Sequence, residues 1–350
     1  MRNTLRVGAA ALAVLMVGSV GAGARGTAKR SNVKRAKDAT HYIAKVQRAK
    51  NGSFPGFSKI GSTADAVMAL VAARRSPTSI DGGVRYLQDH VDDIDDLGEI
   101  AKTVLAHVAA GESTTIGERD LVQEIEAAQL ETGQYGDGAT NAGVYFHNLS
   151  VLALAAAGEN PGPSAGAWLA LAQCDDGGWQ FNNPAGENDD EHCHDGSDTD
   201  FTRSDTNTTS LAIQALDIIP GNENLEHDPF DMFRALKDEE KGGWGFDWTF
   251  TLTDTVSTSL VLQAYATTDR PTPRGGIRAL RALQYGRCKG SPFASTYVDE
   301  NGDGSYTKRE RTKPDPGSTY AGVLGLLTQP YPVPPQEVNK AAPAAVCSKR

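Results

Sequence analysis

Two kinds of predicted helix alternate along most of this 350-residue chain. One kind is apolar on nearly every face, as in residues 150–157 and 260–266. A helix with no polar face is buried all round, so these helices should form an inner layer. The other kind carries more charge and precedes the apolar helix in each segment. This order predicts a buried inner layer surrounded by amphipathic outer helices.

Six segments repeat one plan, in which a glycine-rich turn with an aromatic residue joins a charged helix to one rich in alanine and leucine. Most segments start about 40 residues apart, the period typical of two-helix repeats. Their starts lie near Tyr42, Gly83, Asp120, Ala165, Phe230 and Gly276. The second segment lacks the aromatic turn, and an acidic loop at residues 182–204 lengthens the fourth.

Six such hairpins predict an all-α fold, an α6/α6 toroid with inner and outer rings of helices. An open solenoid is the alternative, but it needs polar caps at both ends, and no clear caps are seen in the sequence. We assign the toroid domain to residues 40–330 and a proline-rich C-terminal tail to residues 331–350.

The N-terminus has the pattern of an export signal. Arg2 and Arg6 precede an apolar run at residues 7–20, which is too short to span a bilayer. The small residues that follow offer a cleavage point near Ala24. We therefore expect a secreted, extracellular protein with a signal peptide at residues 1–24 and no stable membrane insertion; an uncleaved anchor is the alternative. Residues 25–39, rich in lysine and arginine, are expected to form a solvated basic linker.

Net charge and cysteine content indicate the class of partner and the state of the cysteines. A net charge of −10 argues against nucleic acid as a partner. Four cysteines in an exported chain should be oxidised. Three pairings are possible, and we favour Cys174 with Cys193, at the base of the acidic loop, and Cys288 with Cys347, which would attach the tail to the ring.

Two turns carry a recognisable motif. Gln173 followed by Gly177-Gly178-Trp179, and Gly242-Gly243-Trp244 in the next segment, resemble the Gln-Trp repeats of the terpenoid cyclase and protein prenyltransferase superfamily. In that superfamily the motif is structural and ties an outer helix to its neighbour. The resemblance therefore implies the toroid fold more firmly than a reaction. We expect Trp179 and Trp244 to be packing residues.

The resemblance does not extend to the catalytic motif. Squalene-type cyclases carry Asp-x-Asp-Asp-Thr-Ala, whose middle aspartate protonates an alkene, whereas residues 205–210 here read Asp-Thr-Asn-Thr-Thr-Ser. Neither Asn207 nor Thr208 can supply a strong acid. The chain is therefore not expected to be an active class II terpene cyclase. Asp205, and Asp254 in a similar stretch, are expected to cap the helices that follow them.

Residues 299–310 match a calcium-loop pattern in full, with oxygen ligands at alternate positions. The ligands would be Asp299, Asn301, Asp303, Ser305 and Glu310. The flanks do not favour helices, so the loop should be a hairpin inserted at residues 293–317 with a structural calcium ion; a turn without an ion is the alternative. The sequence His192-Cys193-His194 lacks the two separated ligand pairs of a structural zinc site.

The starts of the inner helices should meet at one mouth of the ring and form a concave surface suited to a small molecule or a peptide. The residues expected there are Thr63, Asp65, Tyr145, His147, Asp205, Phe246, Trp248 and Asp254. A diverged enzyme is the second hypothesis, either an isoprenoid cyclase or transferase or a carbohydrate-active hydrolase or lyase. A hydrolase or lyase would need facing carboxylates, or a carboxylate with a tyrosine or histidine. A surface interaction scaffold is the third hypothesis, and a ring with no cavity would indicate it.

Overall fold

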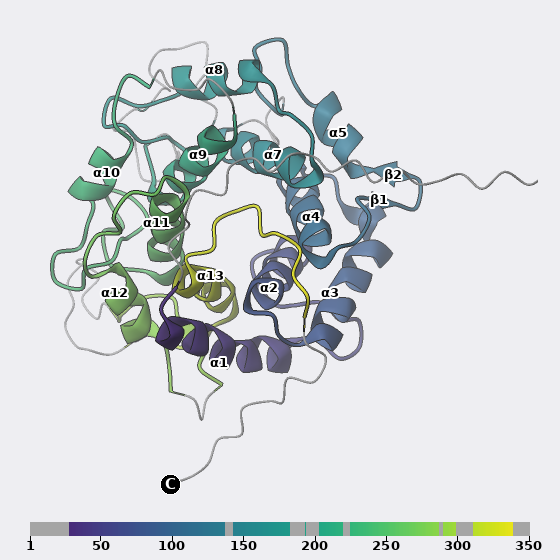
Figure 1. The fold of residues 1–350 in the computed structure, drawn as a ribbon, viewed down its shortest axis with the longest axis horizontal. Coiled ribbons are helices and arrows are strands. Elements are labelled where there is room, and N and C mark those ends of the chain that lie inside the picture. The colour runs from purple at the N-terminus through teal and green to yellow at the C-terminus, as the bar shows by residue number, and fades with distance from the viewer. Residues whose placement is uncertain are drawn as a thin grey trace, which may run out of the picture.

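A computed structural model describes residues 28–136, 143–182, 193, 203–219, 225–286, 290–298 and 311–338. In this part of the chain the helices form two concentric rings (Figure 1). The inner ring is made of α2 (Lys59–Ala73), α4 (Leu97–Ala110), α7 (Val144–Ala157), α9 (Thr206–Ile218), α11 (Thr255–Thr267) and α13 (Pro316–Leu327). The outer ring is made of α1 (Arg30–Val46), α3 (Pro77–Asp89), α5 (Leu121–Ala127), α8 (Pro163–Leu171), α10 (Phe230–Ala235) and α12 (Gly276–Leu283).

The inner ring is closed. Each inner helix contacts the next one in chain order, and the last, α13, contacts both α2 and α1. The remaining elements are a short 3₁₀ helix, η1 (Val91–Asp93), and two antiparallel strand pairs. The pairs are β1 (Thr115–Ile116) with β2 (Arg119–Asp120) and β3 (Phe293–Ala294) with β4 (Pro314–Asp315). The structure thus confirms the predicted all-α, α6/α6 toroid.

The two rings differ in burial as their sequences predict. In the inner helix α7 the residues from His147 to Leu154 are all buried, because neighbours cover every face. The outer helix α12 buries Ala279, Leu280 and Leu283 on one side and exposes charged residues on the other. The inner layer therefore supplies most of the core, and the outer layer shields it from water.

A recurring hydrogen bond joins each aromatic turn to the inner helix that follows it. The backbone N–H of the turn aromatic donates to a side chain in the first turns of that helix, and the donor and acceptor are both buried. The pairs are Phe54 with Thr63 (3.0 Å), Tyr135 with His147 Nδ1 (3.1 Å), Trp179 with Thr209 (2.9 Å), Trp244 with Thr258 (3.0 Å) and Phe293 with Thr319 (3.0 Å). The bond is found in the five segments whose sequence carries an aromatic turn.

The indole N–H groups of the two turn tryptophans each donate a hydrogen bond to the outer helix that precedes the turn. Trp179 Nε1 donates to the Leu169 carbonyl at 2.8 Å, and Trp244 Nε1 donates to the Phe233 carbonyl at 2.7 Å. Both side chains are completely buried. The expectation that Trp179 and Trp244 are packing residues is confirmed.

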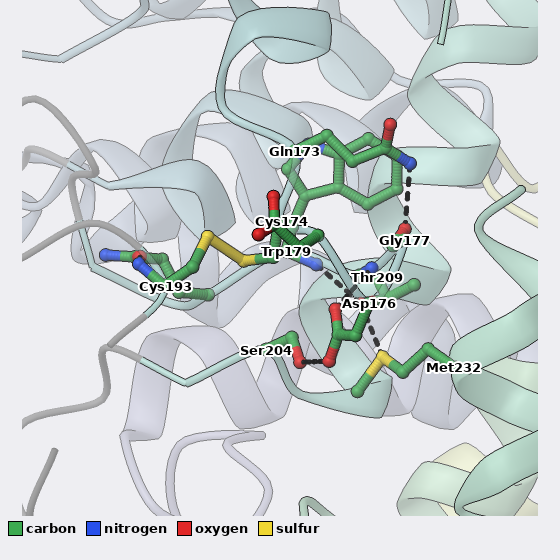
Figure 2. The surroundings of a disulfide bond; sticks show 12 residues. Gln173, Cys174, Asp176, Gly177, Trp179, Cys193, Ser204, Thr209 and Met232 are labelled. Atoms are coloured by element: carbon green, nitrogen blue, oxygen red, sulfur yellow. Dashed lines mark hydrogen bonds between the residues drawn. A yellow bond between two sulfur atoms is a disulfide. The ribbon is translucent and has the colours of Figure 1, made fainter. Parts of the chain in front are cut away.

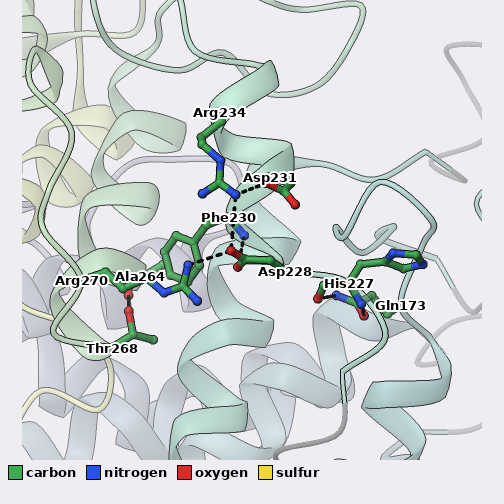
Figure 3. A network of polar contacts seen from close by, with 9 residues as sticks. All are labelled: Gln173, His227, Asp228, Phe230, Asp231, Arg234, Ala264, Thr268 and Arg270. Carbon is green, nitrogen blue, oxygen red and sulfur yellow. Dashed lines mark hydrogen bonds and ion pairs between the residues drawn. The ribbon is translucent and has the colours of Figure 1, made fainter.

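Glutamines tie neighbouring segments together. The Gln173 amide donates to the Gly177 carbonyl in its own turn (2.9 Å) and to the His227 carbonyl of the next segment (3.0 Å; Figures 2 and 3). Gln47, Gln129 and Gln284 make the same pair of bonds in their segments. The second acceptor of Gln284 is the carbonyl of Arg35 on α1, so this glutamine joins the last segment to the first.

The fourth turn packs directly on the next segment. Gly177 has a φ of 87°, and a Cβ there would lie 2.6 Å from the carbonyl oxygen of Asp228, so only glycine fits. Asp228 accepts from Arg270 (2.9 Å), Arg234 (3.3 Å) and the Phe230 amide (3.1 Å), and Arg270 lies over the Phe230 ring (Figure 3). Burial opposes ionisation of Asp228, but these partners outweigh it and hold its pKa below the ordinary value.

Several smaller predictions are also confirmed. Asp205 accepts from the amides of Asn207 and Thr208 and caps α9, and Asp254 accepts from the amide of Ser257 and caps α11. Cys174 and Cys193 form a disulfide beside the Trp179 turn (Figure 2).

Other predictions concern residues outside the described ranges. The signal peptide at residues 1–24, the calcium loop and the cysteines Cys288 and Cys347 all lie outside them. The same holds for most of the acidic loop at residues 182–204.

The expected linker at residues 25–39 differs from the structure, because helix α1 begins at Arg30. The helix contacts α13, and its buried residues include the small side chains Ala36 and Ala39. Asn32, also buried, accepts from Arg281 on α12 at 3.0 Å. Close packing of small residues leaves little hydrophobic signal in the sequence, and the surrounding lysines and arginines conceal it. The first helix of the ring therefore starts at Arg30, about ten residues before the predicted start of the domain at residue 40.

The turn bonds predict the effect of a nearly isosteric substitution. Thr63→Val removes the acceptor of the buried Phe54 amide, and a buried amide without a partner costs about 1–3 kcal/mol. Thr63→Ser keeps the hydroxyl and removes one methyl group, at a cost of about 1 kcal/mol. We expect chemical denaturation to show a larger loss of unfolding free energy for valine than for serine. The reverse order would contradict a structural role for this hydroxyl.

Candidate functional site

The inner ring encloses a cavity of about 190 Å³. All six inner helices contribute to its wall, together with Phe57 from the turn before α2 and Tyr331 from the segment after α13. Most of the wall is aliphatic. The larger apolar side chains that line it are Met68, Leu105, Leu149, Leu211, Leu260 and Leu324.

The cavity follows the axis of the ring. Tyr145, Val256 and Gly317, which line one end, are each the second residue of an inner helix. Leu105 and Gln263, farther in, are each the ninth residue of theirs. Seven residues of helix span about 10 Å. The inner helices therefore run in the same direction, and their first turns surround one mouth of the cavity, where Phe57 is fully exposed.

One ion pair lies in this wall. Lys102 on α4 donates to Asp65 Oδ2 on α2 at 3.0 Å, and the two side chains keep 20% and 29% of their exposure. Burial lowers the pKa of Lys102, but the charge of Asp65 and the hydrogen bond between them outweigh burial and raise it above the usual range. The cavity therefore presents a charged ammonium group next to its carboxylate partner.

The C-terminal segment crosses the ring. After α13 ends at Leu327, residues 328–338 lie across the central opening (yellow in Figure 1). The backbone N–H of Tyr331 donates to Gln214 Oε1 at 2.8 Å, and Val333 is buried. Burial, and then the charge of Asp65, raises the pKa of Tyr331 above its usual range. The phenol of Tyr331 therefore belongs to the wall of the cavity, and the segment covers the end opposite the mouth.

One glutamine of the cavity wall has a buried carbonyl oxygen without a partner. Gln263 on α11 lines the cavity and is 1% exposed. Among the described residues, none donates a hydrogen bond to its Oε1. Such a group is costly unless a ligand or water completes it.

Two of the eight residues predicted at the mouth line the cavity, and they are Asp65 and Tyr145. Tyr145 stacks on Phe181, with ring centroids 4.8 Å apart. Thr63 and His147 are fully buried and serve as acceptors for the turn amides. The sequence correctly placed these two residues near the mouth of the ring. It did not indicate that their polar atoms would accept hydrogen bonds from the turn amides.

The remaining four predicted residues lie around the helix starts and not in the cavity wall. Asp205 and Asp254 are buried caps. The carbonyl of Phe246 accepts from the amide of Thr206 at 2.8 Å. Trp248 is 43% exposed and its Nε1 donates to Asp176 at 3.2 Å.

Burial shifts the pKa of three of these residues strongly. It raises the pKa of Asp205 to about 7 and that of Asp254 to about 6, against the hydrogen bonds from the capped amides. It lowers the pKa of His147 to about 3, against a backbone hydrogen bond at Ala165. Because none of the three lines the cavity, we read these shifts as properties of the fold.

Sequence reasoning missed Lys102, Gln263 and Tyr331. Lys102 is the one lysine of helix α4 and stands in the middle of a largely apolar stretch, and that contrast was a usable signal. Gln263 was part of a stretch read only for its hydrophobicity. Tyr331 was assigned to a tail, and no periodic pattern in that tail indicates where it packs.

The described ranges hold neither a cluster of metal-ligating side chains nor a membrane-spanning helix. No group of three or more histidine, cysteine or acidic side chains there could hold a metal ion. The predicted calcium ligands, from Asp299 to Glu310, are outside those ranges. None of the described helices has the length and apolar character needed to span a membrane.

Comparison with protein-family models and with curated proteins found no match. Many solved structures share the fold, among them the following three. An inactive variant of an α-1,6-mannanase from Salegentibacter, in complex with α-1,6-mannotriose, is 11% identical with a TM-score of 0.51, covering 85% of this chain and 98% of that one. A type II terpene cyclase variant from Scytonema, bound to its product merosterolic acid A, is 12% identical with a TM-score of 0.53, covering 85% and 97%.

The third structure, a protein from Actinoplanes, is 16% identical with a TM-score of 0.53, covering 85% of this chain and 98% of that one. At these identities the likeness establishes the toroid fold alone. It agrees with the resemblance carried by the Gln-Trp motifs. Because a mannanase and a terpene cyclase share the fold equally well, the reaction or ligand must be argued from the cavity.

The shifted pKa of His147 predicts a specific acid sensitivity. The folded protein keeps His147 neutral down to about pH 3, whereas the unfolded chain takes up a proton near pH 6.5, so stability falls as pH decreases through this window. His147→Thr supplies the hydroxyl used in the other turns and should remove this contribution. Between pH 7 and pH 5 we expect the wild type to lose about 2 kcal/mol more unfolding free energy than the variant.

Urea denaturation of both proteins at the two pH values measures that difference. All other titrating groups are common to the two proteins and cancel. An equal pH dependence in the two proteins would show that His147 is protonated in the folded state.

Proposed function

We propose that this protein binds a small, mainly apolar molecule in the central cavity of its ring. The observation that carries the proposal is an aliphatic cavity of about 190 Å³ with the Asp65–Lys102 ion pair in its wall. A mostly apolar pocket with few, fixed polar groups is the usual form of a small-molecule site. The inner helices surround a cavity. A pure interaction scaffold would be expected to have a filled ring instead.

The size of the cavity limits the ligand. A protein cavity of about 150 Å³ holds benzene, which has six non-hydrogen atoms, so this one suits a molecule of about eight non-hydrogen atoms. With Tyr331 in place, a peptide or a long isoprenoid chain is too large. The solved neighbours were determined in complex with larger molecules, mannotriose and merosterolic acid A. In this protein Tyr331, from the segment at residues 328–338, is part of the cavity wall.

The wall chemistry favours binding over catalysis. Glycoside hydrolysis needs two carboxylates on either side of the bond that breaks. Among the described lining residues Asp65 is the one acid, and it is paired with Lys102. Protonation of an alkene needs a strong acid facing the substrate, whereas Asp205 is a buried helix cap outside the cavity wall.

Export of the protein is part of the same proposal. The Cys174–Cys193 disulfide supports it, because such bonds persist in oxidising compartments. The signal-like pattern at residues 1–24 supports it independently. We also retain the calcium loop at residues 299–310 as a proposed structural site, on its sequence pattern. A binding protein outside the cell would meet its ligand at low concentration, for which an enclosed site is well suited.

A cavity-filling substitution tests the binding site. Ala321 lines the cavity from α13, and Ala321→Phe should occupy much of the space. Ala167 on α8 is exposed, so Ala167→Phe adds the same side chain away from the ring interior. With 4-methylphenol as the probe in isothermal titration, we expect the wild type and Ala167→Phe to bind, and Ala321→Phe to bind at least tenfold more weakly.

Two results would contradict the proposal. One is the absence of binding for 4-methylphenol, toluene and indole alike in the wild type. The other is an unchanged affinity in Ala321→Phe, provided that circular dichroism shows the variant to be folded. The first result would favour the scaffold hypothesis. The second result would show that the probe binds elsewhere on the molecule.

A further inference from the structure

The polar groups of the cavity wall gather on three consecutive inner helices. Asp65 comes from α2, Lys102 from α4 and Tyr145 from α7. The other three inner helices, α9, α11 and α13, contribute mainly aliphatic side chains, which are Leu211, Val256, Leu260, Ala321 and Leu324. The cavity therefore has a polar side and an apolar side.

Two polar residues on the apolar side expose almost no surface to the cavity. Tyr320 is 1% exposed, and its phenol donates to the Pro55 carbonyl at 2.9 Å. Gln263 is also 1% exposed, and its carbonyl oxygen is buried. A ligand therefore meets accessible polar groups mainly on the side of α2, α4 and α7.

The Asp65–Lys102 pair uses part of its hydrogen-bonding capacity. An ammonium group carries three N–H donors, and Lys102 Nζ donates one of them to Asp65 Oδ2 at 3.0 Å. Among the described residues no other group accepts from Nζ, and none donates to Asp65 Oδ1. The two side chains keep 20% and 29% of their exposure, and Oδ1 is not a buried atom. The pair can therefore offer a donor and an acceptor, side by side, to one small molecule.

The charges of this pair cancel, and no other described lining residue is an acid or a base with a charge at neutral pH. Burial lowers the pKa of Lys102 and Asp65 raises it, and the next groups that act on it are the phenols of Tyr145 and Tyr331, which therefore lie near the pair. Tyrosine phenols carry no charge at neutral pH. A charged ligand would leave water for a mainly apolar cavity without an opposite charge to balance its own, which is costly. An uncharged ligand avoids that cost.

The polar side becomes aliphatic one helical turn farther along each helix. Residues three or four positions after a polar one lie on the same face of a helix. On α2, α4 and α7 these residues also line the cavity, and they are Met68, Leu105 and Leu149. The part of a ligand beyond the ion pair therefore meets a largely aliphatic wall.

We infer that the ligand is an uncharged molecule with an acceptor oxygen and an N–H or O–H donor close together at one end, for Lys102 and Asp65, and an apolar remainder. The inference rests on the proposed function and specifies the chemistry of its ligand. A primary amide has this combination of groups. A carboxylate lacks the donor, an amidinium lacks the acceptor, and each adds a charge to a cavity wall whose own charges cancel.

Four probes of nearly the same shape test the inference by isothermal titration at pH 7. They are cyclopentanecarboxamide, cyclopentanecarboxylate, cyclopentanecarboxamidinium and cyclopentyl methyl ketone, each of about eight non-hydrogen atoms. We expect the carboxamide to bind the wild type at least tenfold more tightly than either charged probe, because burial of an unbalanced charge is costly. It should bind about tenfold more tightly than the ketone, which has no donor for Asp65.

Matched variants assign this preference to the ion pair. Asp65→Asn leaves the charge of Lys102 unbalanced, so the carboxylate should now bind more tightly than the carboxamide. The double variant Asp65→Leu/Lys102→Met removes both polar groups together, and the affinities for carboxamide and ketone should then agree within about twofold. As a control, Asp38→Asn makes the same change in net charge outside the cavity, at a residue of α1 that pairs with Lys34, and it should keep the wild-type order.

The outcomes separate the inference from the proposed function. A charged probe as the tightest ligand of the wild type, or equal affinities for carboxamide and ketone, would overturn the inference. Cavity binding would stand in either case if 4-methylphenol still binds the wild type and Ala321→Phe weakens that binding. If circular dichroism shows Asp65→Asn to be unfolded, a carboxamide preference that persists in the double variant overturns the inference. No binding by any of these probes, 4-methylphenol included, would remove the proposed function together with the inference.

Discussion

The ring depends on one constraint, which is that a backbone amide removed from water must find an acceptor. The aromatic residue of each turn lies between the outer and inner helices, where its N–H cannot reach solvent. A side chain at the start of the next inner helix supplies the acceptor, in four turns a threonine and in one a histidine. In these five segments the bond fixes where the inner helix starts relative to the turn before it. The glutamine bonds then fix the spacing between segments, so the local geometry is repeated around the ring.

The same constraint explains what the sequence could and could not reveal. Periodicity, glycine-aromatic turns and all-round apolar helices were enough for the toroid, since each is a local signal that recurs in most of the segments. Thr63 and His147 looked like binding residues because they are polar and lie near the mouth. Their acceptor atoms are already used by the turns, and that pairing involves residues 9 and 12 positions away. Polarity at a helix start is thus ambiguous until the hydrogen bonds are known.

The cavity itself was the least predictable part, because its chemistry is assembled from distant segments. Asp65 and Lys102 are 37 residues apart, and Gln214 and Tyr331 are 117 residues apart. No spacing rule connects such pairs in a sequence. The cavity also explains how rings that share a fold can have unrelated ligands, since the outer layer and turns maintain the ring while a few inner positions set the polarity.

Closure of the ring by Gln284 and Arg35 has a consequence for how the molecule can change. An open array of helical hairpins can gain or lose a unit at either end, because its terminal units touch only one neighbour. Here the last hairpin bonds to the first, so no unit is terminal, and adding or deleting one would break contacts on both sides. A single hairpin can therefore be neither added nor deleted without breaking the ring. Length variation is confined to the connections between helices, as in the long segment between α8 and α9, and the ring can diversify its surface without altering its size.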